Sequence, residues 1–364
     1  MLIFSRCQKV RNLVPHTKRF SSPIVVPAII SVTPQVSDRS IVFDYWKLSK
    51  GHLSIWVALS ALPGYLVCAP LDLASISGIL SGTALASASS QALNQIQEKD
   101  RDAKMARTKN RPLPSGRLGE SCARNFALIT AATGSGILTA VSGSLAPATI
   151  ALSTIALYVK VYTPMKTKSN YNTHVGAIAG SLPVMIGFAC AGGFEIFFTS
   201  CAPWVFFTIQ TLWQFPHFYP LAWMYRDDYT NGGYKMFPLG DSTGAETAKM
   251  CAPYMAALSV VPFVSSAIGA TSWMFPVTGS AVNAIWLKQF SSFHSQPSKA
   301  SARQYFLGSL SYLILMMGAF VMHVKPQNEF DWREGVRKKF GKYCVHEAAV
   351  SECNVPTLCP ATPS

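Results

Sequence analysis

Seven long stretches of the chain contain no Asp, Glu, Lys or Arg, and they constrain the fold more than any other feature. A helix that crosses a lipid bilayer needs about 20 apolar residues, and each stretch is long enough for one. The stretches are 51–71, 73–97, 125–159, 169–194, 196–225, 250–287 and 304–324. Only 13% of the residues are charged, against about 25% in soluble domains. We therefore expect lipid to be the main solvent of this chain.

Two of these stretches are too long for a single spanning helix. Residues 125–159 number 35 and residues 250–287 number 38. Each has turn-forming residues near its middle, Gly143 to Pro147 in the first and Gly269 to Pro276 in the second. Two helices are expected in each, so the sequence predicts an all-α membrane protein with nine transmembrane helices.

The basic residues predict how the helices are oriented. Lys and Arg occur before the first helix and in the loops after helices 2, 4, 6 and 8, whereas the loops after helices 1, 3, 5 and 7 contain none. Loops rich in Lys and Arg share one side of a membrane. A basic C-terminal tail, which includes Arg333 and Arg337, falls on the opposite side and departs from this rule.

Residues 1–37 carry five Lys or Arg residues, and no Asp or Glu precedes Asp38. Such a basic, acid-free segment is typical of a mitochondrial transit peptide, although a disordered basic tail would have the same composition. We predict a transit peptide or disordered segment at 1–37, the nine-helix domain at 38–325 and a polar tail at 326–364. The expected location is the mitochondrial inner membrane, with the basic loops facing the matrix.

The end of the second predicted helix carries three oxygen-bearing side chains at helical spacing, Asn94, Glu98 and Asp102. At positions i, i+4 and i+8 they share one face if the helix continues that far. This set suits Mg²⁺, which favours one or two carboxylates together with phosphate oxygens. Ionisable groups at membrane depth are costly and usually serve a function.

A run of cations follows these acids. It contains Lys104, Arg107, Lys109 and Arg111. Guanidinium groups bind phosphate oxygens through paired hydrogen bonds, so acids followed by cations are what a metal-bound diphosphate requires. The alternative is a solvated loop whose charges pair with one another at i and i+4.

A second group of polar residues lies at the end of the sixth predicted helix, which should exit on the same side. His217, Met224 and Asp228 fall on one stripe if that helix is continuous, and Arg226 lies beside them. We expect the two groups to face each other across one cavity. Tyr162 and Lys166 end the fourth helix on that side and are candidates to bind a phosphate, although interfacial Tyr and Lys are also common membrane anchors.

Over about residues 50–325 these motifs resemble the UbiA-type intramembrane prenyltransferases. The family's first motif, Asn-x-x-x-Asp-x-x-x-Asp, matches Asn94, Glu98 and Asp102, with Glu in place of the middle Asp. Its Tyr-x-x-x-Lys element matches Tyr162 and Lys166. The segment Trp-Gln-x-Pro-His, which ends at His217, is similar to the heme-specific branch of the family.

The resemblance implies a nine-helix UbiA-type bundle that transfers a farnesyl group from farnesyl diphosphate to the 2-vinyl group of heme B, giving heme O, a precursor of heme A for cytochrome c oxidase. It implies Mg²⁺ on Asn94, Glu98 and Asp102, with His217 and Asp228 as further catalytic residues. The implied diphosphate-binding residues are Arg107, Lys109, Arg111, Tyr162, Lys166 and Arg226. The family's second motif has Asp where this chain has His217 and Met224, and only Asp228 is retained.

The partners implied are farnesyl diphosphate, heme B and the lipid bilayer, with heme A synthase or cytochrome oxidase assembly factors downstream and no nucleic acid. Two alternatives remain open. A prenyltransferase acting on a quinone precursor such as 4-hydroxybenzoate would share the fold and the diphosphate site. A mitochondrial transporter would spread its polar residues through the depth of the bundle, whereas here they gather at one end.

Overall fold

The structure is a computed structural model that describes residues 41–325, and within this range the regular elements are helices. Nine helices of 11 or more residues, called the long helices below, follow one another in this range and correspond one to one to the nine predicted spans. They are α3 (Gly51–Leu66), α4 (Leu73–Asp102), α5 (Glu120–Ser142), α6 (Ala146–Ala156), α8 (Asn172–Gly192), α10 (Ala202–Met224), α12 (Ala245–Ala267), α13 (Phe275–Ser295) and α14 (Lys299–His323). The predicted segments 1–37 and 326–364 lie outside the described residues.

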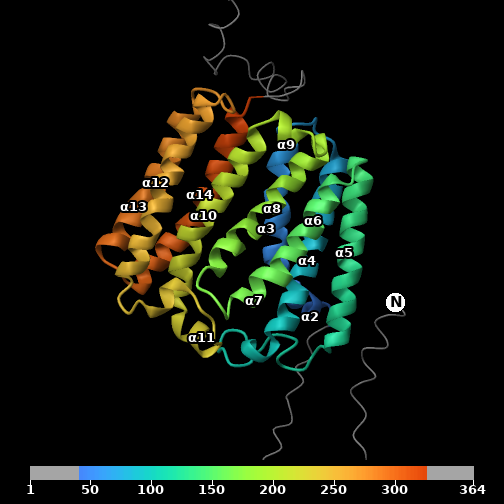
Figure 1. Cartoon of the computed structure of the whole chain (residues 1–364), viewed down its shortest axis with the longest axis vertical. Helices are drawn as coiled ribbons and strands as arrows, with labels where there is room; N and C mark the ends of the chain where they lie inside the picture. Colours follow the sequence, from blue (N-terminus) through green and yellow to red (C-terminus); the bar gives the residue numbers. More distant parts are fainter. Residues whose placement is uncertain (1–40, 326–364) are drawn as a thin grey trace, which may run out of the picture.

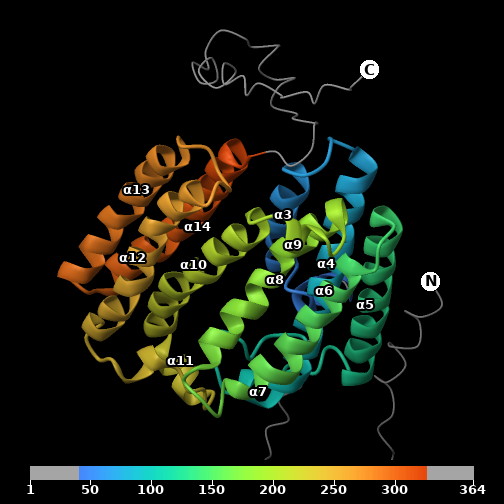
Figure 2. The same cartoon turned by 45° about the horizontal axis from the view of Figure 1, so that its top comes forward.

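Short elements join the long helices. They are α2 (Ile41–Leu48), the π-helix η2 (Leu157–Tyr162), α7 (Thr163–Met165), α9 (Ile196–Thr199), α11 (Arg226–Asn231) and the 3-10 helix η3 (Phe237–Gly240). Figure 1 shows α2, α7 and α11 together at one end of the bundle, beside the long loop between α4 and α5, and Figure 2 shows α7 and α11 at that same end. These elements correspond to four of the five predicted basic segments, so the structure gathers those four at a single end.

The outer surface of the bundle is apolar. Among the described residues, α5, α8, α12 and α14 are each long and apolar enough to cross a membrane. Large hydrophobic side chains such as Leu128, Val260 and Ile314 are exposed on these helices. A soluble monomer seldom exposes apolar patches on this scale. The chain is a multi-pass membrane protein.

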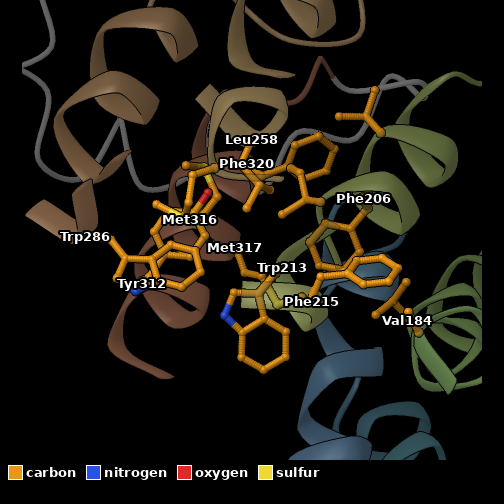
Figure 3. Packing of buried hydrophobic residues seen from close by; sticks show 14 of the residues in the cluster. Val184, Phe206, Trp213, Phe215, Leu258, Trp286, Tyr312, Met316, Met317 and Phe320 are labelled. Atoms are coloured by element: carbon orange, nitrogen blue, oxygen red, sulfur yellow. The ribbon is translucent and has the colours of Figure 1, made fainter. Parts of the chain in front are cut away.

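Of the three apolar clusters among the described residues, the two with the most members hold most of the bundle together. The larger one joins α8, α10, α12, α13 and α14, and Figure 3 shows Val184, Phe206, Trp213 and Trp286 among its members. The second joins α3, α4, α5, α6 and α8. Helix α8 belongs to both clusters, because Val184 packs into the first and Ile186 into the second. It therefore connects the two halves of the protein.

Small residues let the helices of the second cluster approach closely. A Cβ atom added to Gly187 of α8 would overlap the carbonyl oxygen of Ala61 on α3. In the same way, a Cβ on Gly134 of α5 would lie 2.7 Å from the carbonyl oxygen of Gly82 on α4. In a bilayer, where the lipid tails are as apolar as the side chains, such close packing is a main source of helix association.

Candidate active site

The predicted acidic face lies on the last two turns of α4. The helix continues to Asp102, and Asn94, Glu98 and Asp102 are all buried, with at most 5% of each residue exposed. The carboxyl end of a helix carries partial negative charge, which disfavours carboxylates there. Two buried carboxylates at this position therefore need cations or a metal close by.

Cations from three other segments meet these residues. Lys166 Nζ lies 2.8 Å from Glu98 Oε1, and Arg111 Nη1 lies 2.6 Å from Asp102 Oδ2. Lys50 Nζ donates to Asn94 Oδ1 at 3.4 Å. The structure thus brings together six side chains that are up to 116 positions apart in the sequence, from Lys50 to Lys166.

The residues present fit a divalent metal ion. Asp102 Oδ1 is buried and has no hydrogen-bond partner within the described range. Residues 41–325 contain no group of three or more His, Cys, Asp or Glu side chains that could hold a metal, so a metal at this site would rely on two carboxylates and the amide of Asn94. Mg²⁺ commonly binds one or two carboxylates and completes its shell with water and substrate phosphates.

A π-helix positions Lys166. η2 follows α6 and is continued by α7, and Thr163 Oγ1 donates to Tyr158 O at 2.9 Å. Such i→i+5 segments are rare and often occur at functional sites. The rings of Tyr158 and Tyr162 are 5.1 Å apart, and Lys166 Nζ lies 4.6 Å from the centroid of Tyr162. Burial opposes the charge of Lys166, but the Glu98 carboxylate outweighs it and raises the pKa of Lys166 well above its ordinary value.

Three residues of the site were not predicted from the sequence: Lys50, Thr163 and Tyr234. Thr163 Oγ1 accepts a hydrogen bond from Asn94 Nδ2 at 3.1 Å. Tyr234 is buried, and its ring centroid lies 5.9 Å from Lys166 Nζ. Lys50 is one of the basic residues before the first predicted helix, and the sequence uses those residues only to predict the topology. No motif marks these residues, because only the fold brings their segments to α4.

Lys50 has an unusual backbone. Its φ of 46° and ψ of 54° lie in the left-handed region, which costs roughly 1–2 kcal/mol for a residue with a Cβ. Burial, with the cations Arg111 and Lys166 nearby, lowers the pKa of Lys50 to about 7. Both observations indicate that this lysine is held at the site against local cost.

The predicted run of cations after Asp102, which we call the cationic arm, has further members that lie on the surface of the α4–α5 loop. Arg107 is exposed, donates to Tyr229 Oη at 3.3 Å and lies over the rings of Tyr225 and Tyr229. The backbone N–H of Ala106 donates to Asp228 Oδ1 at 3.2 Å. Asp228 therefore anchors the arm to α11. Lys109 is exposed on the loop surface.

The predicted single stripe through His217, Met224 and Asp228 is wrong. Helix α10 ends at Met224, and Tyr225, with φ of −107° and ψ of 23°, separates it from α11. Asp227 and Asp228 then lie in the first turn of α11, where the partial positive charge of a helix start favours acids. A new helix start satisfies these carboxylates better than a continued helix would.

Arg226, a predicted diphosphate ligand, is directed elsewhere. Its Nη1 donates to the carbonyl oxygens of Asp241 and Ser242, each at 3.2 Å. Its guanidinium also lies 3.8 Å from Asp227 Oδ1 and stacks over the ring of Trp223. These contacts hold the loop before α12, and the structure does not bring Arg226 to the acids of α4.

His217 is held between α10 and α14. Its ring stacks on Trp213 and on Phe306, with centroids 4.5 and 4.6 Å apart. Its Nδ1 lies 2.6 Å from Ser309 Oγ, which donates its own proton to Phe306 O at 2.5 Å. A hydroxyl has one proton, so a Ser309 hydroxyl that donates to Phe306 O accepts from His217 Nδ1, and in that tautomer Nε2 of His217 carries the lone pair.

The Trp-Gln-x-Pro-His segment therefore connects two neighbours of α10. Trp213 Nε1 donates to Ser309 O on α14 at 2.8 Å, whereas Gln214 Nε2 donates to Ala177 O on α8, also at 2.8 Å. The contacts of His217 are with α10 and α14 rather than α4. Contact with the α4 site is made instead by α11 and the segment after it, since Arg101 Nη1 donates to Gly232 O at 3.1 Å.

The sequence profile of the UbiA prenyltransferase family matches residues 56–315. This chain belongs to the UbiA prenyltransferase family. The match covers seven of the nine long helices in full and the larger part of α3 and α14, and it includes both groups of polar residues. This finding excludes the transporter that the sequence left open. The heme-specific and quinone-precursor prenyltransferases are both UbiA-type enzymes and are both consistent with it.

Curated relatives narrow the comparison. The protoheme IX farnesyltransferase of Opitutus terrae is 34% identical over 282 residues, which covers 77% of this chain and 94% of the relative. The protoheme IX farnesyltransferase of Solibacter usitatus is 35% identical, and the alignment covers 77% of this chain and 98% of that relative. The mitochondrial protoheme IX farnesyltransferase of Arabidopsis thaliana is 34% identical, and the alignment covers 77% of this chain and 64% of that relative.

Solved structures share the fold. A UbiA homologue from Aeropyrum pernix K1 is 15% identical, covers 78% of this chain and 98% of its own, and gives a TM-score of 0.58. A homologue from Archaeoglobus fulgidus, bound to DMAPP and Mg²⁺, is 16% identical, covers 76% and 99%, and gives a TM-score of 0.57. These matches confirm the predicted UbiA-type fold.

Proposed function

We propose that this chain transfers a farnesyl group from farnesyl diphosphate to the 2-vinyl group of heme B, which makes heme O. The observation that carries the proposal is the alignment of relatives named protoheme IX farnesyltransferase along 77% of the chain. The buried site on α4, with two carboxylates and three cations, has the chemistry that a metal-bound diphosphate requires.

The diphosphate end of the reaction is assigned to α4 and its partners. Asn94, Glu98 and Asp102 would hold Mg²⁺, with the unpaired Asp102 Oδ1 as the readiest ligand. When bound, the metal supplies positive charge to the departing pyrophosphate. Arg111 and Lys166 can exchange their carboxylate partners for phosphate oxygens, because both side chains already point at the site. Stabilising the charge that develops on the leaving group is the main catalytic contribution such a site can make.

The arm that follows α4 and the tyrosine of η2 complete this end. Arg107 and Lys109 are exposed on the loop and would meet the diphosphate as it enters. Tyr162 lies beneath Lys166 and fixes the position of the ammonium group. Asp228 holds the arm through the N–H of Ala106. We therefore assign Asp228 a positioning role. Arg226 is assigned no role at the diphosphate end of the reaction, because it bonds to the loop before α12.

The acceptor end of the reaction is assigned to His217. Its Nε2 lone pair is suited to bind the heme iron, because neutral imidazole is a common ligand of iron. Ser309 fixes the tautomer by accepting the Nδ1 proton, which is the usual role of a second group behind a metal-binding histidine. The flat faces of Trp213 and Phe306 hold the imidazole ring on both sides.

The reaction itself needs little acid–base chemistry. The allylic C–O bond breaks, pyrophosphate leaves, and the vinyl carbon forms a bond to the farnesyl group. Water then adds to the resulting cation and loses a proton, which gives the hydroxyethyl side chain of heme O. A site within an apolar bundle limits early access of water to the farnesyl cation.

We further propose a location in the mitochondrial inner membrane with the site facing the matrix. The acid-free segment 1–37 supports import, and the site lies at the end of the bundle that carries the basic loops. One relative, from Arabidopsis thaliana, is mitochondrial. Heme A synthase or another cytochrome oxidase assembly factor would then receive the product.

A direct assay tests the acceptor. The purified protein in lipid nanodiscs is incubated with farnesyl diphosphate and Mg²⁺, together with either heme B or 4-hydroxybenzoate, and the products are weighed by mass spectrometry. We expect heme B to gain a farnesyl group and a hydroxyl group, with no product from 4-hydroxybenzoate. Prenylation of 4-hydroxybenzoate with heme B unchanged would instead establish the quinone-precursor alternative.

A further inference from the structure

We propose that Lys50 is a further ligand of the diphosphate, a cation that the α2–α3 junction places in the site although no motif marks it. The proposal rests on the proposed function only in requiring a prenyl diphosphate as substrate. It deepens that function by adding a residue to the diphosphate site.

The balance of charge at the site supports this role. Among the described residues, Lys166 pairs with Glu98 and Arg111 pairs with Asp102, whereas the side chain of Lys50 bonds only to the neutral amide of Asn94. With Lys50 protonated, the cluster therefore has one more cation than carboxylates. A prenyl diphosphate keeps negative charge after one Mg²⁺ has bound to it, and a lysine is a well-suited point charge for phosphate oxygens.

The backbone of Lys50 is the second observation. Lys50 is the one non-glycine residue with positive φ among residues 41–325. Glycine adopts this conformation without strain, so a lysine here is explained by its side chain rather than by the turn. Strained residues of this kind cluster at ligand sites, where the surrounding structure holds them in place.

The surrounding structure does hold this junction. Gln95, which follows Asn94 on α4, donates from Nε2 to Lys47 O at 3.0 Å and to Leu48 O at 2.7 Å. Arg117 Nε donates to the buried Asp44 Oδ1 at 2.9 Å and so fastens α2 to the α4–α5 loop. The next residue, Gly51, lies so close to the Trp46 ring that a Cβ would overlap it. The turn is therefore built around α4, and it directs Lys50 toward Asn94.

One substitution separates the charge from the fold. Lys50→Gly removes the ammonium group and also relieves the left-handed strain, because glycine is at ease at this φ and ψ. Lys50→Arg keeps a positive charge. Lys47→Ala is the matched control, since Lys47 is an exposed cation of the same segment whose side chain lies over the Phe43 ring.

The probe is inorganic pyrophosphate with Mg²⁺, titrated calorimetrically into each full-length variant in nanodiscs without acceptor. We expect Lys50→Gly to bind pyrophosphate roughly tenfold or more weakly, the loss of about one charge-assisted hydrogen bond, with an unfolding temperature no lower than that of the unmodified protein. Lys50→Arg should recover part of the affinity, and Lys47→Ala should retain all of it. Unchanged pyrophosphate affinity in Lys50→Gly, or a lowered unfolding temperature, would overturn the proposal.

Steady-state kinetics gives an independent readout. For Lys50→Gly the KM for farnesyl diphosphate should rise by a similar factor, whereas the KM for the acceptor should not change. Because pyrophosphate binding needs no acceptor, the two proposals can fail separately. If heme B is not prenylated but Lys50→Gly still binds pyrophosphate weakly, only the acceptor assignment is lost.

Discussion

Lys166 Nζ and Glu98 Oε1 lie 2.8 Å apart, and the two side chains are only 11% and 7% exposed. This ion pair ties the end of α7 to α4. Removing charges from water is costly, and the mutual attraction offsets that cost only when both partners are present. The pair thus prepares a site in which each charge can exchange its partner for substrate or metal without being left alone.

Loss of either α4 carboxylate should abolish transfer. In Glu98→Gln and Asp102→Asn the side chains keep their shape but lose the charge that Mg²⁺ needs, so we expect turnover to fall by about 100-fold or more. Asp100→Asn is the control, because Asp100 lies on the same helix but is exposed. The measurement is heme O formation by protein whose membrane insertion has been verified. Normal turnover in both charge variants would contradict the metal assignment.

The ion pair predicts a recoverable loss of stability. Lys166→Met leaves the buried Glu98 carboxylate without its cation, and we expect a loss of roughly 3 kcal/mol in the free energy of unfolding. Adding Glu98→Gln should restore most of that stability but none of the activity, because the double variant has neither charge. Thermal unfolding in detergent measures the first quantity and the prenylation assay the second. If the double variant is less stable than Lys166→Met, the two residues are not coupled as the structure indicates.

Replacing His217 should weaken the binding of heme B without changing the affinity for pyrophosphate. His217→Ala is expected to weaken heme B binding by at least tenfold, and Ser309→Ala by a factor of about ten, because second partners of metal-binding histidines commonly contribute that much. Pyrophosphate affinity should not change in either variant. His294→Ala, an exposed histidine on α13, is the control. The measurement is a spectroscopic heme titration, and equal heme affinity in His217→Ala would remove this residue from the acceptor site.

Two glycines should respond in opposite directions to the same change. Gly187→Ala places a methyl group against the Ala61 carbonyl oxygen and forces α3 and α8 apart, at an expected cost of about 1–3 kcal/mol. Gly136→Ala on α5 meets no atom within 4 Å and should gain about 0.5–1 kcal/mol from helix propensity. Unfolding temperatures measured side by side compare them. Equal effects would show that the close α3–α8 contact does not support the bundle.

Much of the fold could be predicted because a membrane leaves few choices. Backbone groups in lipid must bond within their own segment, so a long charge-free stretch is a helix. The positions of Asn94, Glu98 and Asp102 on one face followed from helical periodicity alone, once α4 was taken to continue to Asp102. These predictions depend on local sequence, and the structure confirms the helix that carries them.

The break between α10 and α11 and the π-helix before Lys166 could not be predicted in this way. At Tyr225 an α-helix and a helix break are both possible locally, and the contacts of Arg226 with Asp241 and Ser242 accompany the break. The π-helix has no sequence mark, yet it precedes the lysine that reaches Glu98. The hydrogen bonds of Arg226 to Asp241 and Ser242, and that between His217 and Ser309, could not be predicted either, because they also depend on contacts between distant segments.

The spans, the basic end of the bundle and the acid-bearing face of α4 follow from the amino-acid sequence alone, because each depends on the solvent and on spacing along one helix. Which cations meet those acids depends on the folded arrangement of the chain. Lys50, Arg111 and Lys166 come from three separate segments, and whether a side chain reaches α4 depends on backbone turns that are stabilised by contacts distant in the sequence. That is why the strained turn at Lys50 became visible only in the folded chain.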